Sequence, residues 1–169
     1  MGTESANSRF VKIILQHLQA VLKPHGFQKR GRTFVADGEG VTLLVNLQSS
    51  TSSTEDELLA TINLAVHLPR LAERTGAGKE TLSKSVWDSH WSRRIGHLME
   101  HQQDYWWRIS DDEQAERAGN HMANILRRDG LPALLEVAAI DKLKTLWEQG
   151  QSPGLTERQR DRYLELLKA

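Results

Sequence analysis

The chain has 169 residues, the length of one ordinary domain, and its 22 Lys and Arg are balanced by 22 Asp and Glu. Zero net charge excludes a general attraction to nucleic acid or membranes, so any basic function must be local. The absence of cysteine excludes disulfides, thiolate nucleophiles and sulfur-ligated zinc, and is typical of a reducing compartment. With no apolar run near the ~20 residues that span a bilayer and no signal-like start, we expect one cytoplasmic domain over residues 1–169, frayed at 1–7.

Apolar residues at helical spacing predict an amphipathic helix over residues 10–22, with Asn7 or Ser8 as its N-cap. Pro24 and Gly26 follow, and both residue types are common where a helix ends. We therefore expect the chain to leave the helix here and to enter a sheet.

Three strands are predicted next, over residues 27–37, 41–48 and 61–68. The apolar alternation of the first strand changes phase near Gly31, which indicates a bulge that exchanges its two faces. Gly38 predicts a hairpin turn between the first and second strands. A polar, serine-rich connection leads to the third strand.

The second and third strands each predict one apolar and one mixed face, because successive side chains point to opposite sides of a sheet. The expected core face is Val41, Leu43, Val45, Leu47, Ile62, Leu64, Val66 and Leu68. The other face carries Asn46, Gln48 and Asn63, and asparagine is a poor strand former at such central positions. This face is either a solvated surface or a recognition surface, and composition does not separate the two.

Residues 70–84 predict a short helix, broken by the glycines at 76 and 78. Gly78 and Lys79 match part of a phosphate loop, but Glu73 stands where that pattern requires glycine. No buried parallel strand precedes this stretch, so we reject a phosphate loop.

Two more short strands are predicted over residues 92–98 and 105–109. A capping box at Ser110 opens a helix that Gly130 is expected to end. The remaining helices are predicted over residues 131–139, after Asp141, and over residues 156–169 after a Gly and Pro linker that begins at residue 150. These elements predict a single α+β domain: an antiparallel sheet of four or five strands with helices packed mainly on one face.

His97, Glu100 and His101 match H-x-x-E-H, in which one helix presents two zinc-binding histidines and a glutamate base. Here His97 falls in a predicted strand and His101 in the turn that follows, so the two rings are expected to point apart. We therefore expect no metal and no cofactor.

No linear motif supplies a catalytic nucleophile, since the chain has neither cysteine nor a G-x-S-x-G elbow. Its acidic clusters are explained by solvation or by helix capping. We expect a binding domain rather than an enzyme. One alternative is a small hydrolase in which His67 or His97 converges with Asn46 and Asn63 in a cleft of the sheet.

Basic residues form two clusters in predicted strands, one at residues 29–32 and the other at residues 93–94. If the clusters share a sheet face, their arginines form a site for phosphate or carboxylate. Trp106 and Trp107 lie nearby, so an alternative is a site that stacks a nucleotide or single-stranded nucleic acid. The structural alternative is an edge strand protected by charge, with both tryptophans in the core. Zero net charge favours an acidic protein partner or a small anionic ligand over a polynucleotide.

The order GF-x-KRGRTF, VNLQSS, TINLAVHLP, RRIGHL and YWW resembles the bacterial family called domain of unknown function 4304. The resemblance covers roughly residues 10 to 140 and is closest in KRGRTF and the two strands that follow. It implies an α+β domain of bacterial origin and no particular activity. The general plan is also similar to that of immunity proteins of toxin systems, an analogy at the level of fold alone.

We therefore predict an uncharacterised binding domain whose polar and arginine-rich sheet face recognises an acidic protein partner or a small anionic ligand. An immunity-type or accessory role would suit such a domain. The candidate binding residues are Lys29, Arg30, Arg32, Asn46, Gln48, Asn63, Arg93 and Arg94. No membrane partner is expected.

Overall fold

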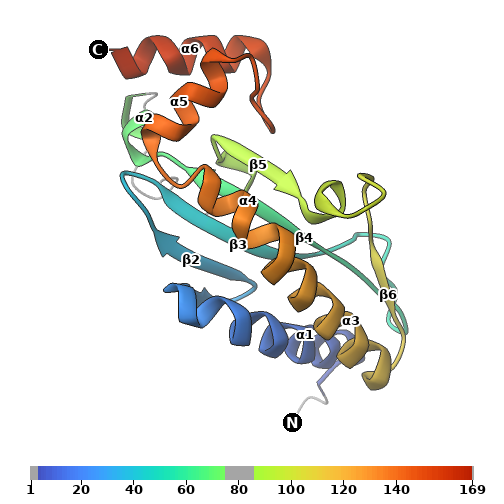
Figure 1. The fold of residues 1–169 in the computed structure, drawn as a ribbon. Coiled ribbons are helices and arrows are strands. Elements are labelled where there is room, and N and C mark those ends of the chain that lie inside the picture. Colours follow the sequence, from blue (N-terminus) through green and yellow to red (C-terminus); the bar gives the residue numbers. More distant parts are fainter. Residues whose placement is uncertain (1–3, 75–85, 169) are drawn as a thin grey trace.

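The computed structural model describes residues 4–74 and 86–168, and an antiparallel sheet of six strands runs through these ranges (Figure 1). The strands are β1 (Gln28–Arg30), β2 (Thr33–Asp37), β3 (Thr42–Ser49), β4 (Leu58–His67), β5 (Trp91–Arg94) and β6 (Trp107–Ile109). The helices are α1 (Ala6–Leu22), α2 (Pro69–Arg74), α3 (Asp112–Ile125), α4 (Leu131–Glu136), α5 (Ile140–Glu148) and α6 (Glu157–Lys168). The α+β class predicted from the sequence is confirmed.

The strand order is β1-β2-β3-β4-β5, and β6 pairs with β4 beside β5. β4 is long enough to hold both short strands on one edge: its first residues pair with β6, and residues 63–66 pair with β5. The helices α1, α3 and α4 lie against one face of this sheet (Figure 1). The opposite face carries polar side chains of β3 and β4 together with a small apolar cluster of Val35, Leu44, Ala65 and Val86.

The first helix begins earlier than the sequence predicted, because Ser5 rather than Asn7 or Ser8 is its N-cap. The Ser5 hydroxyl accepts a hydrogen bond from the backbone N–H of Ser8, 3.1 Å away, and so satisfies one of the free donors of the first turn. The expected end is confirmed, since Gly26 adopts a left-handed conformation with φ 85° directly before the sheet.

The predicted bulge at Gly31 is wrong, because the chain reverses there. Gly31 takes φ 63°, and β1 folds back on β2 so that Arg30 pairs with Thr33 and Lys29 with Phe34. The phase change in the apolar pattern therefore marks a tight hairpin between two strands. The division of the first predicted strand into β1 and β2 explains why the sheet has six strands rather than four or five.

The strand predicted over residues 92–98 is shorter than expected, because β5 ends at Arg94 and a 3-10 helix, η3 (Ile95–Leu98), follows. Gly96 lies in this helix with its Cα against the backbone of residues 103–105. A Cβ at this position would lie 2.3 Å from the carbonyl oxygen of Gln103, so only glycine allows the approach. The contact positions the loop that leads into β6.

Gly130 does not end the helix that the sequence placed before it. The chain continues through a π-helical segment, η4 (Leu126–Gly130), directly into α4, and Gly130 keeps right-handed helical angles. Pro132 lacks the N–H that would bond the carbonyl four residues earlier, and a widened turn accommodates that loss. Gly130 also allows close packing, since a Cβ there would lie 2.8 Å from Leu126 Cδ1.

The C-terminal helices α5 and α6 follow, as the sequence predicted, and the loop between them returns to the sheet. The backbone N–H of Ser92 in β5 donates to the carbonyl of Pro153, 3.1 Å away. This loop therefore covers part of the outer edge of β5. Of the helix predicted over residues 70–84, α2 is observed, whereas the predicted glycine break and the rejected phosphate loop lie outside the described residues.

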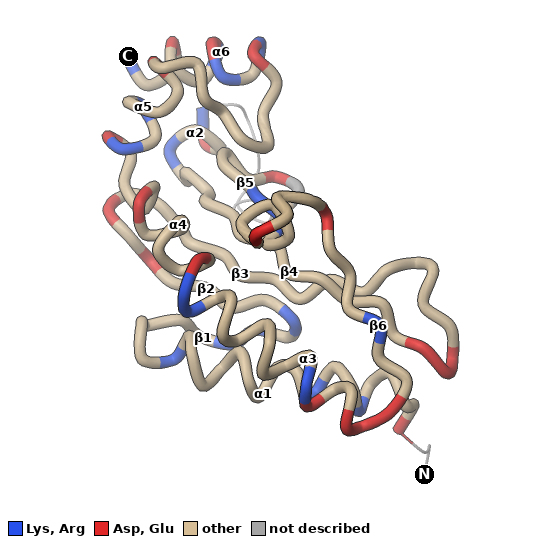
Figure 2. The backbone as a smooth tube through the Cα atoms, turned by 45° about the vertical axis from the view of Figure 1, so that its right-hand side comes forward, with Lys and Arg blue, Asp and Glu red and all other residues tan. Residues whose placement is uncertain are grey.

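Lys and Arg alternate with Asp and Glu along the helices and loops of the chain (Figure 2). Exposed ion pairs such as Arg9 with Asp112 and Arg108 with Glu57, each 2.7 Å long, tie helices and strands together. Pairs this exposed contribute about 1 kcal/mol or less. In the described ranges, no helix combines the length and the apolar character needed to cross a bilayer.

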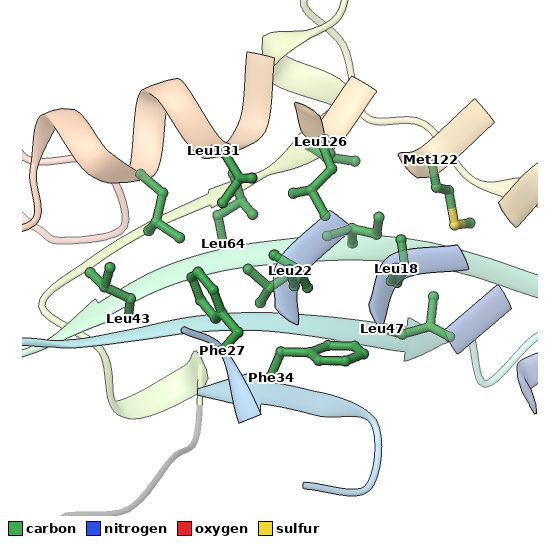
Figure 3. Close-up of a cluster of buried hydrophobic side chains, with 14 of the residues drawn as sticks. Leu18, Leu22, Phe27, Phe34, Leu43, Leu47, Leu64, Met122, Leu126 and Leu131 are labelled. Carbon is green, nitrogen blue, oxygen red and sulfur yellow. The ribbon is translucent and has the colours of Figure 1, made fainter. Parts of the chain in front are cut away.

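The core lies between the sheet and the helices α1, α3 and α4 (Figure 3). The apolar faces predicted for β3 and β4 point into it, and Leu43, Leu47 and Leu64 are almost fully buried. Phe27 and Phe34 extend the same layer toward the β1–β2 hairpin (Figure 3). Since α1, α3 and α4 cover this face, the sheet is accessible from the opposite face and along its edges, and at the β5 edge a cavity also borders α4 and α5.

Candidate functional site

One polar residue from each of five neighbouring strands lies at the same register on the open face of the sheet. Arg30 pairs with Thr33, Thr33 with Asn46, Asn46 with Asn63, and Asn63 with Arg94. We call this set the polar row. At ~4.8 Å between strands it extends about 19 Å across the sheet. The row joins the basic hairpin at one edge to the arginines of β5 at the other.

Side-chain hydrogen bonds connect four members of the polar row. The Asn46 amide donates to Thr33 Oγ1 at 3.0 Å, and the Asn63 amide donates to Asn46 Oδ1 at 3.4 Å. Arg94 Nε in turn donates to Asn63 Oδ1 at 3.3 Å. Gln48, two residues after Asn46 on the same face of β3, accepts a hydrogen bond from the Asn63 amide at 2.8 Å. These contacts explain why two asparagines occupy central strand positions despite their low strand propensity.

Asn63 is the centre of this network and is almost fully buried, with 5% of its surface exposed. We predict that Asn63→Leu lowers the free energy of unfolding by about 2 kcal/mol, because it leaves polar groups of Gln48 and Arg94 without their partner. Urea denaturation of the variant measures this loss. Asn120→Leu, at an exposed position of α3, is the control and should change stability by less than about 0.5 kcal/mol. Equal stability of the two variants would contradict a structural role for the network.

Arg94 is held in place by four different groups. Its guanidinium forms an ion pair of 2.8 Å with Asp104, donates to Gln48 at 3.4 Å, and lies 5.1 Å from the ring centroid of Trp106. The Trp106 indole N–H donates to the same Asp104 carboxylate at 3.1 Å. The Arg94 side chain is thus fixed and its charge is balanced by Asp104.

The two basic clusters do not share one face. Lys29 pairs with Phe34 and Arg93 pairs with Leu64. Both side chains therefore lie on the face of the sheet that the helices cover. Arg32 lies in the β1–β2 turn, where its guanidinium donates to Ser49 Oγ at 2.6 Å. Among the candidate residues, the open face therefore gathers Arg30, Arg32, Asn46, Gln48, Asn63 and Arg94.

A cavity of about 410 Å³ opens where the polar row meets β5. We call it the basic cavity. Its polar lining is Asn63, Ser92, Arg93, Arg94, His97 and Asp104. Three of these side chains are basic and one is acidic, and the acidic one is already paired with Arg94.

Arg93 also lines this cavity, although its side chain leaves β5 on the opposite side from Arg94. Its side chain is half-buried, and within the described residues it has neither a hydrogen bond nor an ion pair. A guanidinium whose N–H groups are not used by other described residues can bind an oxyanion through paired N–H donors. Arg93 is therefore the group in the basic cavity with the greatest capacity to bind an anion.

The tryptophans do not form the stacking platform that the nucleic-acid alternative requires. Trp107 is 5% exposed, and its indole N–H donates to His121 Nδ1 at 3.0 Å, so its faces are closed to a base. Trp106 is half-buried and already stacked on Arg94. The structural alternative, in which tryptophan belongs to the core, is correct for Trp107.

The histidines named for the hydrolase alternative lie apart. His67 is 2% exposed, so it cannot reach a substrate. His97 is exposed and lines the basic cavity with Asn63, whereas Asn46 does not. His97 and His101 fall at the end of η3 and in the turn after it, and the described residues contain no group of three His, Cys, Asp or Glu that could hold a metal.

Two structural features were not predicted from the sequence, the ion pair of Asp104 with Arg94 and the buried pair of His67 and His90. Asp104 neutralises Arg94 from a loop that shows no strand or helix periodicity, and no pattern in the sequence marks it. His90 packs beside His67, with ring centroids 5.1 Å apart, and its Nδ1 accepts the N–H of Leu68 at 2.9 Å. Burial, with a smaller effect from His67, lowers the pKa of His90 to about 4.

The fold and the site together define an α+β domain that closes one face of an antiparallel sheet with helices and keeps a hydrogen-bonded polar row on the other. The model of the family described as domain of unknown function (DUF4304) matches residues 18–136, and the chain belongs to this family. Neither the curated proteins nor the solved structures contain a match.

Proposed function

We propose that the protein is a binding domain that holds an anionic group, a carboxylate or a phosphate, in the basic cavity at the β5 end of the polar row. The observation that carries this proposal is Arg93, a half-buried guanidinium that no other described residue hydrogen-bonds or pairs with, in the wall of a cavity also lined by Arg94 and His97. The cavity volume of about 410 Å³ falls within the range of about 300–1,000 Å³ that is common for small-ligand sites.

The polar row supports this role by fixing Arg94 before a ligand arrives. Arg94 uses N–H groups toward Asn63, Gln48 and Asp104, which leaves part of its five-donor guanidinium for a ligand. A guanidinium that is already oriented loses little conformational entropy on binding. The row therefore acts as a rigid support, and Arg93 supplies the unbalanced charge.

The anionic group can come from a small molecule or from an acidic side chain of a protein partner, since both present the same oxyanion. A polynucleotide is disfavoured by the zero net charge, by the alternation of basic and acidic residues along the chain and by the buried Trp107. Arg30 and Arg32, at the exposed β1–β2 hairpin, lie across the sheet from the cavity and would add contacts only for an extended acidic partner.

We expect inorganic phosphate, citrate or a hexaglutamate peptide to bind saturably and to shift the indole N–H resonance of Trp106, which touches Arg94. Arg93→Gln and His97→Gln should each weaken that binding, the first by about tenfold, which corresponds to about 1.4 kcal/mol. Arg158→Gln, at an exposed position of α6, removes the same charge elsewhere and should leave binding unchanged.

The three probes separate the two sources of the anion. Preference for phosphate or citrate identifies a small ligand, and preference for hexaglutamate identifies an acidic partner. If none of them binds, or if Arg93→Gln binds as tightly as the Arg158→Gln control, the proposal is wrong.

A further inference from the structure

A second cavity, of about 510 Å³, lies on the helix-covered side of β5, between that strand, α4 and α5. We call it the helix-side cavity. Arg93 forms part of its wall too, whereas Arg94 and His97 line only the basic cavity. The two cavities are thus distinct spaces whose linings have Arg93 and Pro153 in common.

Charged groups of both signs surround the helix-side cavity. Arg93 and Lys142 bring positive charge, and Glu136 and Asp141 bring negative charge. Lys142 Nζ donates to the carbonyl of Leu135 at 3.3 Å, so it also closes the C-terminal end of α4. Glu136 and Asp141 are exposed at the rim of the cavity, and within the described residues their carboxylates have no hydrogen-bond or ion-pair partner, so they are available to a ligand.

The rest of the wall includes apolar surface. The half-buried Leu146 lines it from α5, Ala133 and Val137 line it from α4 and the residue after it, and Trp91 of β5, only 3% exposed, contributes little surface. An apolar group of a ligand would gain about 25 cal/mol for each Å² of apolar surface that it covers here. The cavity therefore combines an apolar wall with an unpaired cation and two unpaired anions.

We propose that the helix-side cavity binds a small zwitterion with an apolar side chain, of the free α-amino acid class. The carboxylate of such a ligand pairs with Arg93, its ammonium group pairs with Glu136 or Asp141, and its side chain packs against Ala133 and Leu146. A simple anion or cation would complement only one of the two charge types. Arg93 is shared with the basic cavity, whereas Glu136, Asp141 and Leu146 line only the helix-side cavity, so variants of these residues test this inference separately from the proposed function.

The test uses L-leucine together with two compounds that each lack one of its charges: 4-methylpentanoate, without the ammonium group, and 3-methylbutylamine, without the carboxylate. Binding is followed by calorimetry and by the NMR signals of Trp91 and Leu146. We expect saturable binding of leucine, and binding of each analogue weaker by about tenfold or more, or about 1.4 kcal/mol.

Matched variants assign the site. The double variant Glu136→Gln/Asp141→Asn should weaken leucine binding by about tenfold and leave phosphate binding in the basic cavity unchanged. Glu148→Gln, at an exposed position of α5, the helix that contains Asp141, is the control and should bind leucine like the unmodified protein. His97→Gln should leave leucine binding unchanged.

Three results would overturn the inference: no saturable binding of leucine, equal binding of leucine and its two analogues, or unchanged leucine binding in the double variant. Each can occur whether or not phosphate binds, so failure of this inference is distinguishable from failure of the proposed function. A circular dichroism spectrum of the double variant confirms that it is folded before its binding is interpreted.

Discussion

Gly96→Ala is expected to lower the free energy of unfolding by about 3 kcal/mol and to displace Asp104 from Arg94. A Cβ at position 96 would lie 2.3 Å from the carbonyl oxygen of Gln103 and 2.6 Å from the backbone nitrogen of Tyr105. Both are backbone atoms, so no side-chain rotation relieves the overlap, and the whole loop must move. That loop carries Asp104 and Trp106, and the basic cavity would therefore lose its shape along with part of the protein's stability.

Urea denaturation measures the loss, and the indole N–H resonance of Trp106 reports the displacement. Gly150→Ala is the matched control: Gly150 has φ 82°, and a Cβ there meets no atom within 4 Å. This variant should lower the free energy of unfolding only by the cost of a left-handed alanine, about 1–2 kcal/mol. The Trp106 resonance should stay in place. If Gly96→Ala is no more destabilising than Gly150→Ala, residues 103–105 do not depend on this close contact.

We expect the protein to lose stability in mild acid through His90. Its pKa in the folded state is lowered to about 4 by burial and by His67, whereas the unfolded chain titrates near 6.5. Below pH 6.5 the unfolded state therefore binds the proton first. The stabilisation from keeping His90 neutral is complete above pH 6.5 and falls as the pH approaches 4, by about 3 kcal/mol in total.

His67 adds to this effect in the same direction. Burial lowers its pKa, although the nearby Asp88 partly opposes the shift. Because the two rings are in contact, with centroids 5.1 Å apart, protonation of one further disfavours protonation of the other.

Urea denaturation between pH 7.5 and 4 measures the slope of stability with pH. His90→Asn keeps an acceptor near the position of Nδ1 for the N–H of Leu68 but does not titrate, so its slope should be clearly smaller. His101→Asn, at an exposed position, should keep the slope of the unmodified protein. An unchanged slope in His90→Asn would contradict this source of acid sensitivity.

The faces of β3 and β4 could be predicted because their side chains alternate with period two. Val45 and Leu64 lie on the core face, and Asn46 and Asn63 lie on the opposite face. This assignment does not depend on the exact ends of the strands. The hairpin at Gly31 could not be separated from a bulge, since both change the phase of the apolar pattern. The π-helical continuation through Gly130 was missed because glycine normally ends helices.

Part of the candidate site could likewise be predicted from the sequence, and part could not. Asn46, Gln48 and Asn63 were found from the sequence because residues of low strand propensity in strong strands need a local reason. Arg93 and Arg94 were treated as one cluster, but neighbouring residues of a strand face opposite sides; here both line the basic cavity, and only Arg93 also lines the helix-side cavity. The ion pair of Arg94 with Asp104 depends on a loop path that residue spacing does not determine.

The polar row also determines how the strands can align while the chain folds. A slip of one residue between β3 and β4 would turn Asn46 toward the helices and Val45 toward the open face. Asn46 would then lose Thr33 and Asn63 as partners and lie in an apolar layer. Only the observed alignment keeps these amides hydrogen-bonded, so the same side chains that shape the open face also select one sheet register over its nearest competitors.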